Sequence, residues 1–501
     1  MADHDPLFAR PEAREACGVF GIYAPGEDVS RLTYFGLFAL QHRGQESAGI
    51  AVSDGRRLTC RREMGLVSQI FDEEHFRQLR GDLAIGHTRY STTGSSTLAN
   101  AQPMVAEWRG GTVALAHNGN LVNALRLRQE LEAQGERFEA TSDSEIMLRM
   151  IVREADRTGD LEQAIANGMP RWQGAYSLTI LTEQAVMAVR DPYGVRPLCI
   201  GTLNGEAIVF SSETCALHVI GARFLREVAP GEIVVADKDG LRARQAVLSP
   251  RQALCVFEFI YMARPDSQIL GELVHEARRR LGHQLAEAQP AQVDMVIPVP
   301  DTGWPAAIGF AERCGVPFGE GLIRNRYIPR TFIQPDQRLR ELGVKVKLNP
   351  LREALQGKRV AVVDDSIVRG TTKRQIIGII RDAGAREVHV RISAPPYRWP
   401  CYYGVDTSNR SELIAARAGS VDEIREAIGA DSLGYQSIQG LLAGLRIPQE
   451  KLCLACFTGH YPIAIPADVR LGKLDLEEHG WRSDEQPATE AARPSPTATQ
   501  G

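Results

Sequence analysis

The 501-residue sequence has no uninterrupted apolar run long enough to span a bilayer, which excludes a membrane-spanning protein. It has no marked excess of charge of either sign, because its formal net charge is −4, and so gives no electrostatic reason to expect a nucleic-acid partner. Its first residues, MADHDPLFARPEAREA, include acids and no apolar segment, and are therefore not a secretory signal. These absences predict a cytoplasmic protein that binds neither membranes nor nucleic acid.

Cysteine is scarce, and its count is odd. Nine cysteines in a chain of this length argue against a disulfide framework and favour thiol or metal chemistry. The remaining composition, 44% hydrophobic and 24% charged residues, is typical of a soluble globular protein. The length exceeds that of one ordinary hydrophobic core, so we expect two domains.

The first half of the chain alternates short strand patterns with helical ones. Eight β-like runs are CGVFGIY, SAGIAVS, DLAIGHTRY, TVALAHNG, YSLTILT, AVMAVR, AIVFSS and EIVVAD. Helical patterns lie at 30–41, 121–133 and 142–155, the last with a capping box formed by Ser142 and Glu145. So many strands before the midpoint predict packed sheets with helices outside, an α+β layered arrangement.

From about residue 250 the pattern changes to apolar strands alternating with long helical segments. The strand runs are DMVIPVPDTG, KRVAVVDDSIVRG and REVHVRISAPP. This βαβ order predicts an α/β domain with a parallel sheet covered on both faces. We place the two domains at 17–248 and 249–470. Residues 471–501 are polar and rich in Pro, Ser, Thr and Ala, which is typical of a disordered tail.

The strongest local signal is VAVVDDSIVRGTTKRQIIGIIRDAG, in which Asp364 and Asp365 end a buried strand run and a short loop opens a helix. Ligands of open α/β sheets bind at the carboxyl ends of strands, and the first N–H groups of a helix form an anion cradle. The acids suit ribose hydroxyls, Mg²⁺ or a developing positive charge at a sugar carbon. The alternative is an ordinary strand–loop–helix connection with solvated acids.

This run resembles the phosphoribosylpyrophosphate (PRPP) motif of the type I phosphoribosyltransferases. The resemblance implies that Asp364 and Asp365 hold the ribose and assist one Mg²⁺ per subunit, while the loop cradles the 5′-phosphate. The loop residues that it implies are Ser366, Val368, Arg369, Gly370, Thr371 and Thr372.

Cys17 lies directly before the first strand run and is either a small buried hydrophobe or a nucleophile. Its candidate partners are Arg43 in LQHRGQESAG, Arg89 in GHTRYSTTG, Asn118 and Gly119 in AHNGNL, and Asp143 in TSDSE. Some have plain alternatives on their own: a surface ion pair for Arg89, a two-residue turn at 118–119 and a helix N-terminus for Asp143.

Together and in this order, these motifs resemble the N-terminal-nucleophile (class II) glutamine amidotransferase domain, over roughly residues 17–237. The resemblance implies an αββα layered sandwich in which Cys17 attacks the side-chain amide of glutamine. Its base is its own α-amine, since the pKa of a free α-amine is about 7.7–8. The remaining implied roles are the oxyanion site for Asn118 and Gly119, and glutamine binding for Arg43, Arg89 (α-carboxylate) and Asp143 (α-ammonium).

This mechanism requires Cys17 to be the first residue, because a nitrogen acylated by Ala16 is an amide without useful basicity. We therefore predict that residues 1–16 are the propeptide of a zymogen, cleaved at the Ala16–Cys17 bond. The alternative is an ordinary disordered N-terminus.

Four further cysteines are candidate metal ligands: Cys255, Cys401 and the C-x₂-C pair Cys453 and Cys456. On spacing alone, zinc, a redox pair and core packing all remain open. Their contexts resemble those of the iron–sulfur branch of the amidophosphoribosyltransferase family, which implies one 4Fe–4S cluster per subunit with a structural or oxygen-sensing role. The others match no ligand position and are expected to be structural: Cys60, Cys199, Cys215 and Cys314.

The whole region from Cys17 to about residue 471 resembles this family. The resemblance implies conversion of glutamine, PRPP and water into 5-phosphoribosylamine, glutamate and pyrophosphate, the first step of de novo purine biosynthesis. It also implies a homotetramer that purine nucleotides inhibit. Two alternatives are another class II glutamine amidotransferase with a different acceptor, which VAVVDDSIVRGTT disfavours, and a non-catalytic PRPP-sensing regulator, which would need a basic DNA-reading segment.

The basic run LIRNRYIPRTFIQP is either a solvated face or, by the resemblance, a flexible loop that closes over pyrophosphate. Its implied loop residues are Arg324, Arg326, Tyr327 and Arg330. Two positions depart from the family pattern: Arg324 replaces Lys, and Pro329 replaces Gly and narrows the options of the loop. Gly303 in VPDTGW replaces Ser, so a side-chain contribution to Mg²⁺ is lost there, where a backbone carbonyl or water would substitute.

Intact-mass measurement with N-terminal sequencing of anaerobically purified protein tests the processing. The expected result is a mature chain that starts at Cys17 and carries iron and sulfide. Active enzyme that retains residues 1–16 would contradict the predicted cleavage.

Overall fold

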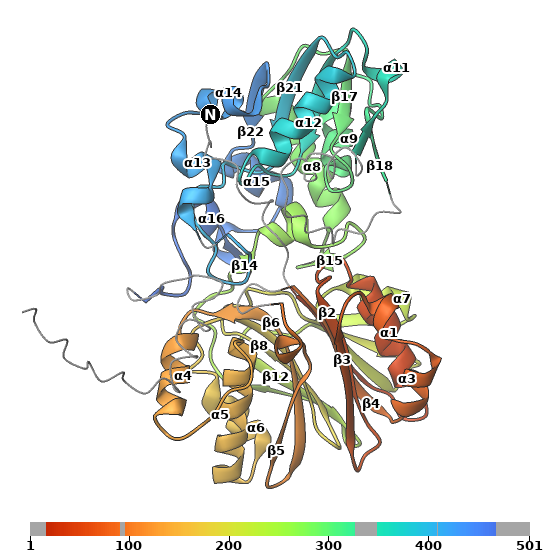
Figure 1. Ribbon diagram of the computed structural model, residues 1–501, viewed down its shortest axis with the longest axis vertical. Coiled ribbons are helices and arrows are strands. Elements are labelled where there is room, and N and C mark those ends of the chain that lie inside the picture. The colour runs from red at the N-terminus through yellow and green to blue at the C-terminus, as the bar shows by residue number, and fades with distance from the viewer. Residues whose placement is uncertain (1–16, 91–95, 326–347, 408, 467–501) are drawn as a thin grey trace, which may run out of the picture.

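Most strands of the chain belong to three large sheets (Figure 1). Successive side chains along each strand point to opposite faces of its sheet. The computed structural model describes residues 17–90, 96–325, 348–407 and 409–466. In Figure 1 the first half, red to yellow-green, lies below the second half, green to blue. The predicted propeptide 1–16 and tail 471–501 lie outside the described residues.

The first sheet has seven strands, and β1, which directly follows Cys17, lies in its interior. The order across the sheet is β11-β9-β10-β1-β4-β2-β3, and every neighbouring pair is antiparallel. The strands are β1 (Gly18–Tyr23), β2 (Ser47–Ser53), β3 (Leu58–Met64), β4 (Leu83–Arg89), β9 (Cys199–Leu203), β10 (Ala207–Ser211) and β11 (Arg223–Glu227).

The second sheet has six antiparallel strands in the order β13-β12-β8-β7-β6-β5. The strands are β5 (Met104–Trp108), β6 (Gly111–Leu121), β7 (Gly174–Leu181), β8 (Val186–Arg190), β12 (Glu232–Asp237) and β13 (Gly240–Gln245).

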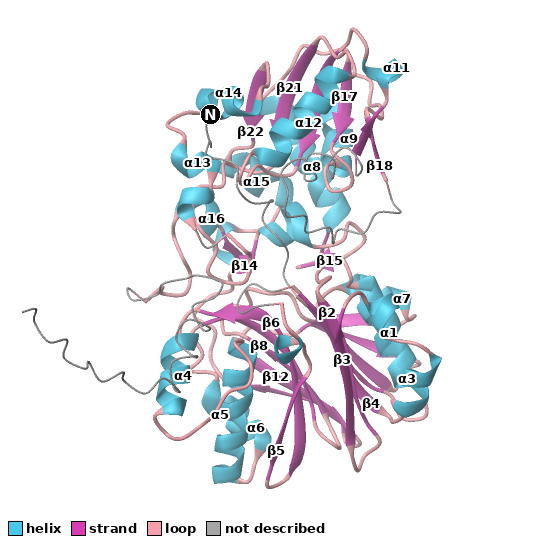
Figure 2. Cartoon of the chain, viewed as in Figure 1, coloured by secondary structure: helices cyan, strands magenta, loops and turns pink. Residues whose placement is uncertain are grey.

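The two sheets pack face to face because their strands are apolar on both sides. Val19 of β1 packs between the sheets with Ala114 of β6, whereas the next residues, Phe20 and Leu115, face outward. Helices cover both outer faces (Figure 2). They are α1 (Val29–Ala39), α2 (Val67–Ile70), α3 (Glu73–Gln78) and α7 (Thr214–Val219) on the first sheet, and α4 (Ala124–Glu132), α5 (Asp143–Thr158) and α6 (Leu161–Gly168) on the second. The predicted αββα layering is confirmed.

All eight predicted strand runs of this half form strands, but five strands have no predicted run: β3, β5, β9, β11 and β13. Four of these five are the edge strands of the two sheets. Every residue of β13 is exposed, and β3 has six half-buried residues and one exposed residue, so neither strand shows the apolar pattern of an interior strand.

The start of α5 corrects one detail of the prediction. Ser142 is the N-cap, and its hydroxyl accepts a hydrogen bond from the Ser144 N–H at 3.3 Å. The Glu145 carboxylate does not complete a capping box. It accepts instead from the N–H groups of Glu139 at 3.1 Å and Ala140 at 2.6 Å, and so fixes the turn that leads into the helix.

The second half is built on a four-stranded parallel sheet. In spatial order its strands are β17 (Met295–Pro298), β20 (Arg359–Asp364), β21 (Glu387–Ile392) and β22 (Ser432–Tyr435). Val296 packs with Phe310 on one face, and Ile297 packs with Ile376 on the other. The helices around the sheet are α8 (Val274–Ala288), α9 (Trp304–Cys314), α12 (Thr371–Asp382), α14 (Val421–Ile428) and α15 (Ile438–Leu445). The predicted parallel sheet with both faces covered is confirmed.

A short parallel strand pair lies where the two halves meet (Figure 1). It consists of β14 (Leu254–Cys255) and β23 (Leu452–Cys453). Residues 246–253, before β14, form no helix or strand. The smaller elements are β15 (Gln268–Ile269), β16 (Glu272–Leu273), β18 (Leu322–Arg324), β19 (Leu348–Pro350), α11 (Arg352–Leu355), α13 (Ile414–Arg417), α16 (Ala455–Thr458), the π-helical η3 (Glu258–Met262), and the 3₁₀ turns η2 (Leu98–Asn100), η4 (Arg410–Glu412) and η5 (Gln449–Lys451). Among the described helices, none combines the length and apolar character that crossing a membrane requires.

Phe310 is fully buried between α9 and the parallel sheet, so its truncation leaves a cavity beneath β17 and β20. Phe310→Ala is expected to lower the free energy of unfolding of the second half by about 3–5 kcal/mol, measured by urea denaturation. Leu248→Ala is the control, because Leu248 is 85% exposed and its truncation is expected to change the free energy of unfolding by less than about 0.5 kcal/mol.

Candidate active site

Cys17 lies at the entrance to β1, next to the end of β4. Its thiol donates a hydrogen bond to the Tyr90 carbonyl at 3.3 Å and accepts one from the Tyr90 N–H at 3.4 Å. Burial raises the pKa of the thiol, and the bond from Tyr90 and the positive charge of Arg89 oppose this rise. The main chain of one strand end therefore fixes the thiol of the neighbouring strand.

Asn118 and Gly119 lie inside β6, so the turn that their sequence suggests does not form. Asn118 is fully buried, yet neither its side-chain nitrogen nor its side-chain oxygen has a hydrogen-bond partner among the described residues. Gly119 has φ +151°, and a Cβ there would lie 1.9 Å from the carbonyl oxygen of Ala175. A buried amide without partners is costly, and its presence points to a polar ligand that supplies them.

Arg89 and Asp143 are both buried, and the charges of both act on the Cys17 thiol. Arg89 ends β4, and its Nη1 lies 3.8 Å from Oε2 of Glu46. The predicted alternative of a surface ion pair therefore does not hold.

Asp143 accepts a hydrogen bond from the Leu121 N–H at 2.9 Å and lies 3.5 Å from Nδ1 of His117. Although burial alone raises the pKa of Asp143, His117 and the hydrogen bonds lower it overall, so this carboxylate stays ionised. A cationic group and an anionic group thus flank the thiol, as an amino acid substrate requires.

His87, also in the GHTRY segment, is not placed as a base. Its Nε2 lies 2.9 Å from the His117 carbonyl oxygen, and burial lowers the pKa of the ring to about 3. The imidazole is therefore neutral near pH 7, and its described contacts do not include Cys17.

Arg43 has partners other than a substrate. Its Nε donates to the carbonyl oxygen of Cys17 at 3.1 Å, and its Nη atoms pair with Glu213 and, at 2.8 Å and 2.9 Å, with Glu258. The side chain is 1% exposed. Binding of glutamine by Arg43 stays a prediction; the contacts that are present hold the backbone of the nucleophile.

The candidate PRPP loop follows β20. Asp364 ends the strand, and Gly370, with φ +84°, precedes the first turn of α12. The Thr371 hydroxyl is buried and has no hydrogen-bond partner among the described residues. An unpartnered hydroxyl at a helix N-terminus suits a phosphate.

The two acids of the loop have different surroundings. Asp364 forms a buried ion pair with Lys373. Asp365 accepts hydrogen bonds from the hydroxyls of Ser366, at 2.6 Å, and of Thr302, and burial raises its pKa. Lys373 and Thr302 carry no sequence signal of their own, because each acts only through the acid that it contacts.

The other loop residues are distributed as follows. Arg369 pairs with Glu412 at 2.7 Å, and Arg324 pairs with Asp301, beside Thr302. A Cβ at Gly303 would lie 2.7 Å from the carbonyl oxygens of Val299 and Val363, so the backbone there admits no side chain. Three predicted loop residues and Pro329 lie outside the described residues: Arg326, Tyr327 and Arg330.

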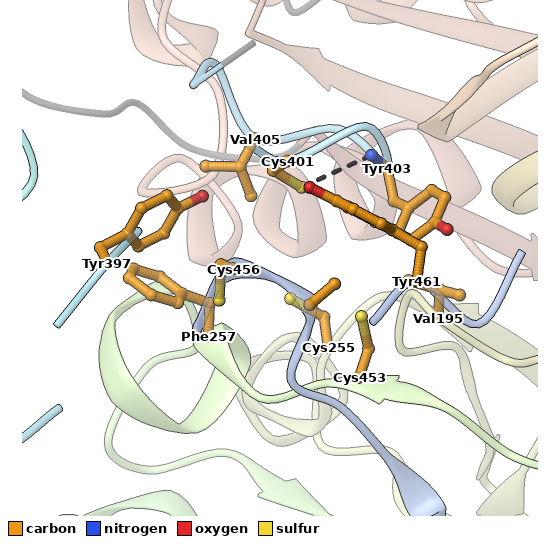
Figure 3. Close-up of a pocket in the computed structure, with 11 residues that line it drawn as sticks. Val195, Cys255, Phe257, Tyr397, Cys401, Tyr403, Val405, Cys453, Cys456 and Tyr461 are labelled. Atoms are coloured by element: carbon orange, nitrogen blue, oxygen red, sulfur yellow. Dashed lines mark hydrogen bonds between the residues drawn. The ribbon is translucent and has the colours of Figure 1, made fainter. Parts of the chain in front are cut away.

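The four candidate ligand cysteines line one cavity at the junction of the two halves (Figure 3). Cys255 and Cys453 lie on the paired strands β14 and β23, Cys456 on α16, and Cys401 on the segment after β21. Burial raises the pKa of Cys255 to about 12 and also raises the pKa values of Cys453 and Cys456. Tyr and Phe side chains complete the wall of the cavity.

All nine cysteines are described, and none forms a disulfide. The four cysteines expected to be structural lie away from this cavity: Cys60, Cys199, Cys215 and Cys314. Within the described part of the chain, no three His, Cys, Asp or Glu side chains gather closely enough to hold a single metal ion. The thiols instead surround a shared space.

Comparison with known proteins covers both halves. A family model for a glutamine amidotransferase domain matches residues 87–219. The amidophosphoribosyltransferase of Synechococcus elongatus is 56% identical over 471 residues, which are 93% of this chain and 95% of the relative.

Two solved structures are also similar. Glutamine PRPP amidotransferase from Bacillus subtilis, complexed with ADP and GMP, has a TM-score of 0.85 at 47% identity and covers 91% of this chain and 100% of its own. A structure described as the allosteric regulatory enzyme of purine biosynthesis has a TM-score of 0.86 at 47% identity, and covers 91% of this chain and 98% of its own. Such identity over most of the chain, in sequence and in fold, shows that the chain belongs to the amidophosphoribosyltransferase family.

Proposed function

We propose that the two sites divide the reaction of this family between them, with glutamine hydrolysed at Cys17 and PRPP converted to 5-phosphoribosylamine at the loop after β20. The observation that carries the proposal is the buried, unpartnered amide of Asn118, on the strand that faces the Cys17 sheet. It provides donors for an oxyanion beside a thiol that the charges of Arg89 and Asp143 flank. The products are glutamate, pyrophosphate and 5-phosphoribosylamine, at the first step of purine biosynthesis.

In the glutaminase half, Arg89 binds the α-carboxylate of glutamine and Asp143 binds the α-ammonium. Cys17 Sγ attacks the side-chain carbonyl, and Asn118 with Gly119 stabilises the oxyanion that forms. Ammonia leaves as the acyl-enzyme forms, and water then releases glutamate.

The α-amine of Cys17 is the base that takes the thiol proton in this scheme. Support comes from His87, whose ring is neutral and whose described contacts do not include Cys17, and from the position of Cys17 before the first residue of β1. The scheme requires removal of residues 1–16, because only a free amine has a pKa near neutral pH.

In the second half, Asp364 and Asp365 hold the ribose hydroxyls, and the loop from Ser366 to Thr372 holds the 5′-phosphate. Hydroxyl and carboxylate oxygens of Thr302 and Asp365 are the ligand types that Mg²⁺ prefers, and they lie in contact. One Mg²⁺ per subunit would neutralise the charge of the pyrophosphate leaving group. Gly303 contributes no side chain to it.

One 4Fe–4S cluster per subunit is proposed at the four-cysteine cavity. Support comes from four thiols that reach one cavity from three separate segments, with apolar and aromatic walls around it. Cluster binding would require these thiols to lose their protons. In the free protein the raised pKa values of Cys255, Cys453 and Cys456 keep them protonated. The cluster would hold these segments together, since the reaction transfers no electrons.

Regulation by purine nucleotides, a homotetrameric assembly and a cytoplasmic location complete the proposal. The similar Bacillus subtilis structure was solved with ADP and GMP, which supports nucleotide binding in this family.

Cys17→Ala tests the division of labour. Without the nucleophile, glutamine hydrolysis and glutamine-dependent synthesis are expected to fall at least about a thousandfold. Synthesis from PRPP and ammonium is expected to remain within about twofold of the unmutated enzyme, because the second site is unchanged. Pyrophosphate release with each nitrogen donor is the measurement. Glutamine hydrolysis that survives in the variant would contradict the assignment of the nucleophile.

Cys453→Ser tests the cluster site, and Cys199→Ser is its matched control. Both cysteines are buried in strands, but only Cys453 lines the cavity. Iron and acid-labile sulfide, measured after anaerobic purification, are expected to be lost from Cys453→Ser and retained in Cys199→Ser. Full iron and sulfide in both variants would refute the proposed ligand set.

A further inference from the structure

Four charged side chains are buried together where the two halves of the chain meet. Arg43, Arg196 and Glu213 belong to the first half, and Glu258 begins η3 in the second. Each is at most 1% exposed. Two cations and two anions balance, as buried charges must. Apart from the predicted binding of glutamine by Arg43, the proposed chemistry uses none of these charges directly.

Arg196, in the loop between β8 and β9, spans the junction. Its Nε and Nη2 both donate to the Tyr403 carbonyl oxygen, at 3.1 Å and 2.8 Å, and its Nη1 pairs with Glu258 at 3.3 Å. Tyr403 and Glu258 are both residues of the second half. The guanidinium thus fixes two separate segments of that half to one point of the first half.

Arg196 holds residues 402–404 through the Tyr403 carbonyl, and these residues lie against β6, the strand that carries Asn118 and Gly119. The Asn120 side chain donates to the Tyr402 carbonyl oxygen at 3.0 Å. A Cβ on Gly404 would lie 3.2 Å from the carbonyl carbon and oxygen of Gly119, and 3.0 Å from Nη2 of Arg196. Residues 402–404 therefore form the wall behind Gly119, where an added methyl group would displace its neighbours by a few tenths of an ångström.

The other partner of Arg196 leads to the nucleophile. Both oxygens of the Glu258 carboxylate accept from Arg43, at 2.8 Å and 2.9 Å, and Arg43 donates to the carbonyl oxygen of Cys17 at 3.1 Å. The side chains that connect this path, Arg43, Glu258 and Arg196, are each at most 1% exposed. The path runs from the main chain of Cys17 to the wall behind Gly119.

We propose that Arg196 is a positioning residue for the glutaminase reaction, which sets the distance between Cys17 and the oxyanion site from across the junction. The inference rests on the proposed function of Cys17. Arg196 contacts no reacting atom. On one side it pairs with Glu258, which holds Arg43 and through it the main chain of Cys17. On the other side it holds residues 402–404, which lie against Gly119. A purely structural role would affect both active sites equally, whereas positioning affects the first alone.

Arg196→Gln removes the positive charge and the Nε and Nη2 donors that together hold the Tyr403 carbonyl oxygen. Its kcat for glutamine hydrolysis is expected to fall about 10–100-fold, because a displacement of about 1 Å at the reacting atoms has that effect. The KM for glutamine is expected to stay within about threefold, since Arg89 and Asp143 remain, and ammonia-dependent synthesis within about twofold. Arg196→Lys keeps the charge with a single donor, and its kcat is expected to lie between those of Arg196→Gln and the unmutated enzyme.

Arg128→Gln is the matched control. Arg128 is also a buried arginine with an ion pair, to Glu132 at 2.8 Å, and a carbonyl contact, to Ala140 at 3.1 Å, but these partners lie in the first half. Urea midpoints of both variants show whether stability is lost equally. Loss of glutaminase kcat in Arg196→Gln but not in Arg128→Gln supports positioning.

Gly404→Ala changes the same wall behind Gly119 with a residue of the second half. It tests the inference if Arg196→Gln does not fold. It is expected to show the same loss of glutaminase kcat with ammonia-dependent synthesis retained. Equal falls in both activities, or unchanged glutaminase kcat in a folded variant, would overturn the inference. If the unmutated enzyme failed to hydrolyse glutamine, or Cys17→Ala still did so, the proposed function itself would fall.

Discussion

Neutralisation of buried charge at the junction is the constraint on which the rest of this structure depends. An unpaired arginine or glutamate at zero exposure costs several kcal/mol, so the junction can bury Arg196 and Glu258 only because they pair with each other across it. That contact brings residues 402–404 against β6, and it places Glu258 on Arg43, which donates to the carbonyl oxygen of Cys17. The position of the halves, the wall of the oxyanion site and the backbone of the nucleophile therefore have one physical origin.

The sequence predicts interior strands well and edge strands badly. Interior strands such as β1 and β7 are buried on both faces, and their mostly apolar runs mark them. An edge strand such as β13, GLRARQ, is exposed along its whole length and owes its conformation to pairing with β12. Pairing with a distant strand leaves no local pattern, which is why four of the five unpredicted strands of the first half are edge strands, with the interior strand β9 as the fifth.

The candidate sites show the same division. Motifs locate Cys17, Arg89, Asp143 and the acid pair after β20, because each chemistry needs those residue types in a fixed local order. Contacts that act through main-chain atoms or across the junction produce no sequence motif. The two bonds between Tyr90 and the thiol need no particular side chain at that position. Glu258 lies more than two hundred residues from Arg43, one of the two arginines that it pairs with.

The pairing of β14 with β23 has a consequence for how the protein is made. Cys255 lies near the middle of the chain, whereas Cys453 and Cys456 are among its last described residues. Synthesis from the N-terminus therefore completes both large sheets of the first half and the whole parallel sheet before the fourth thiol exists. The four sulfurs can therefore line one cavity only after Cys456 has been synthesised, later than every strand of the three large sheets.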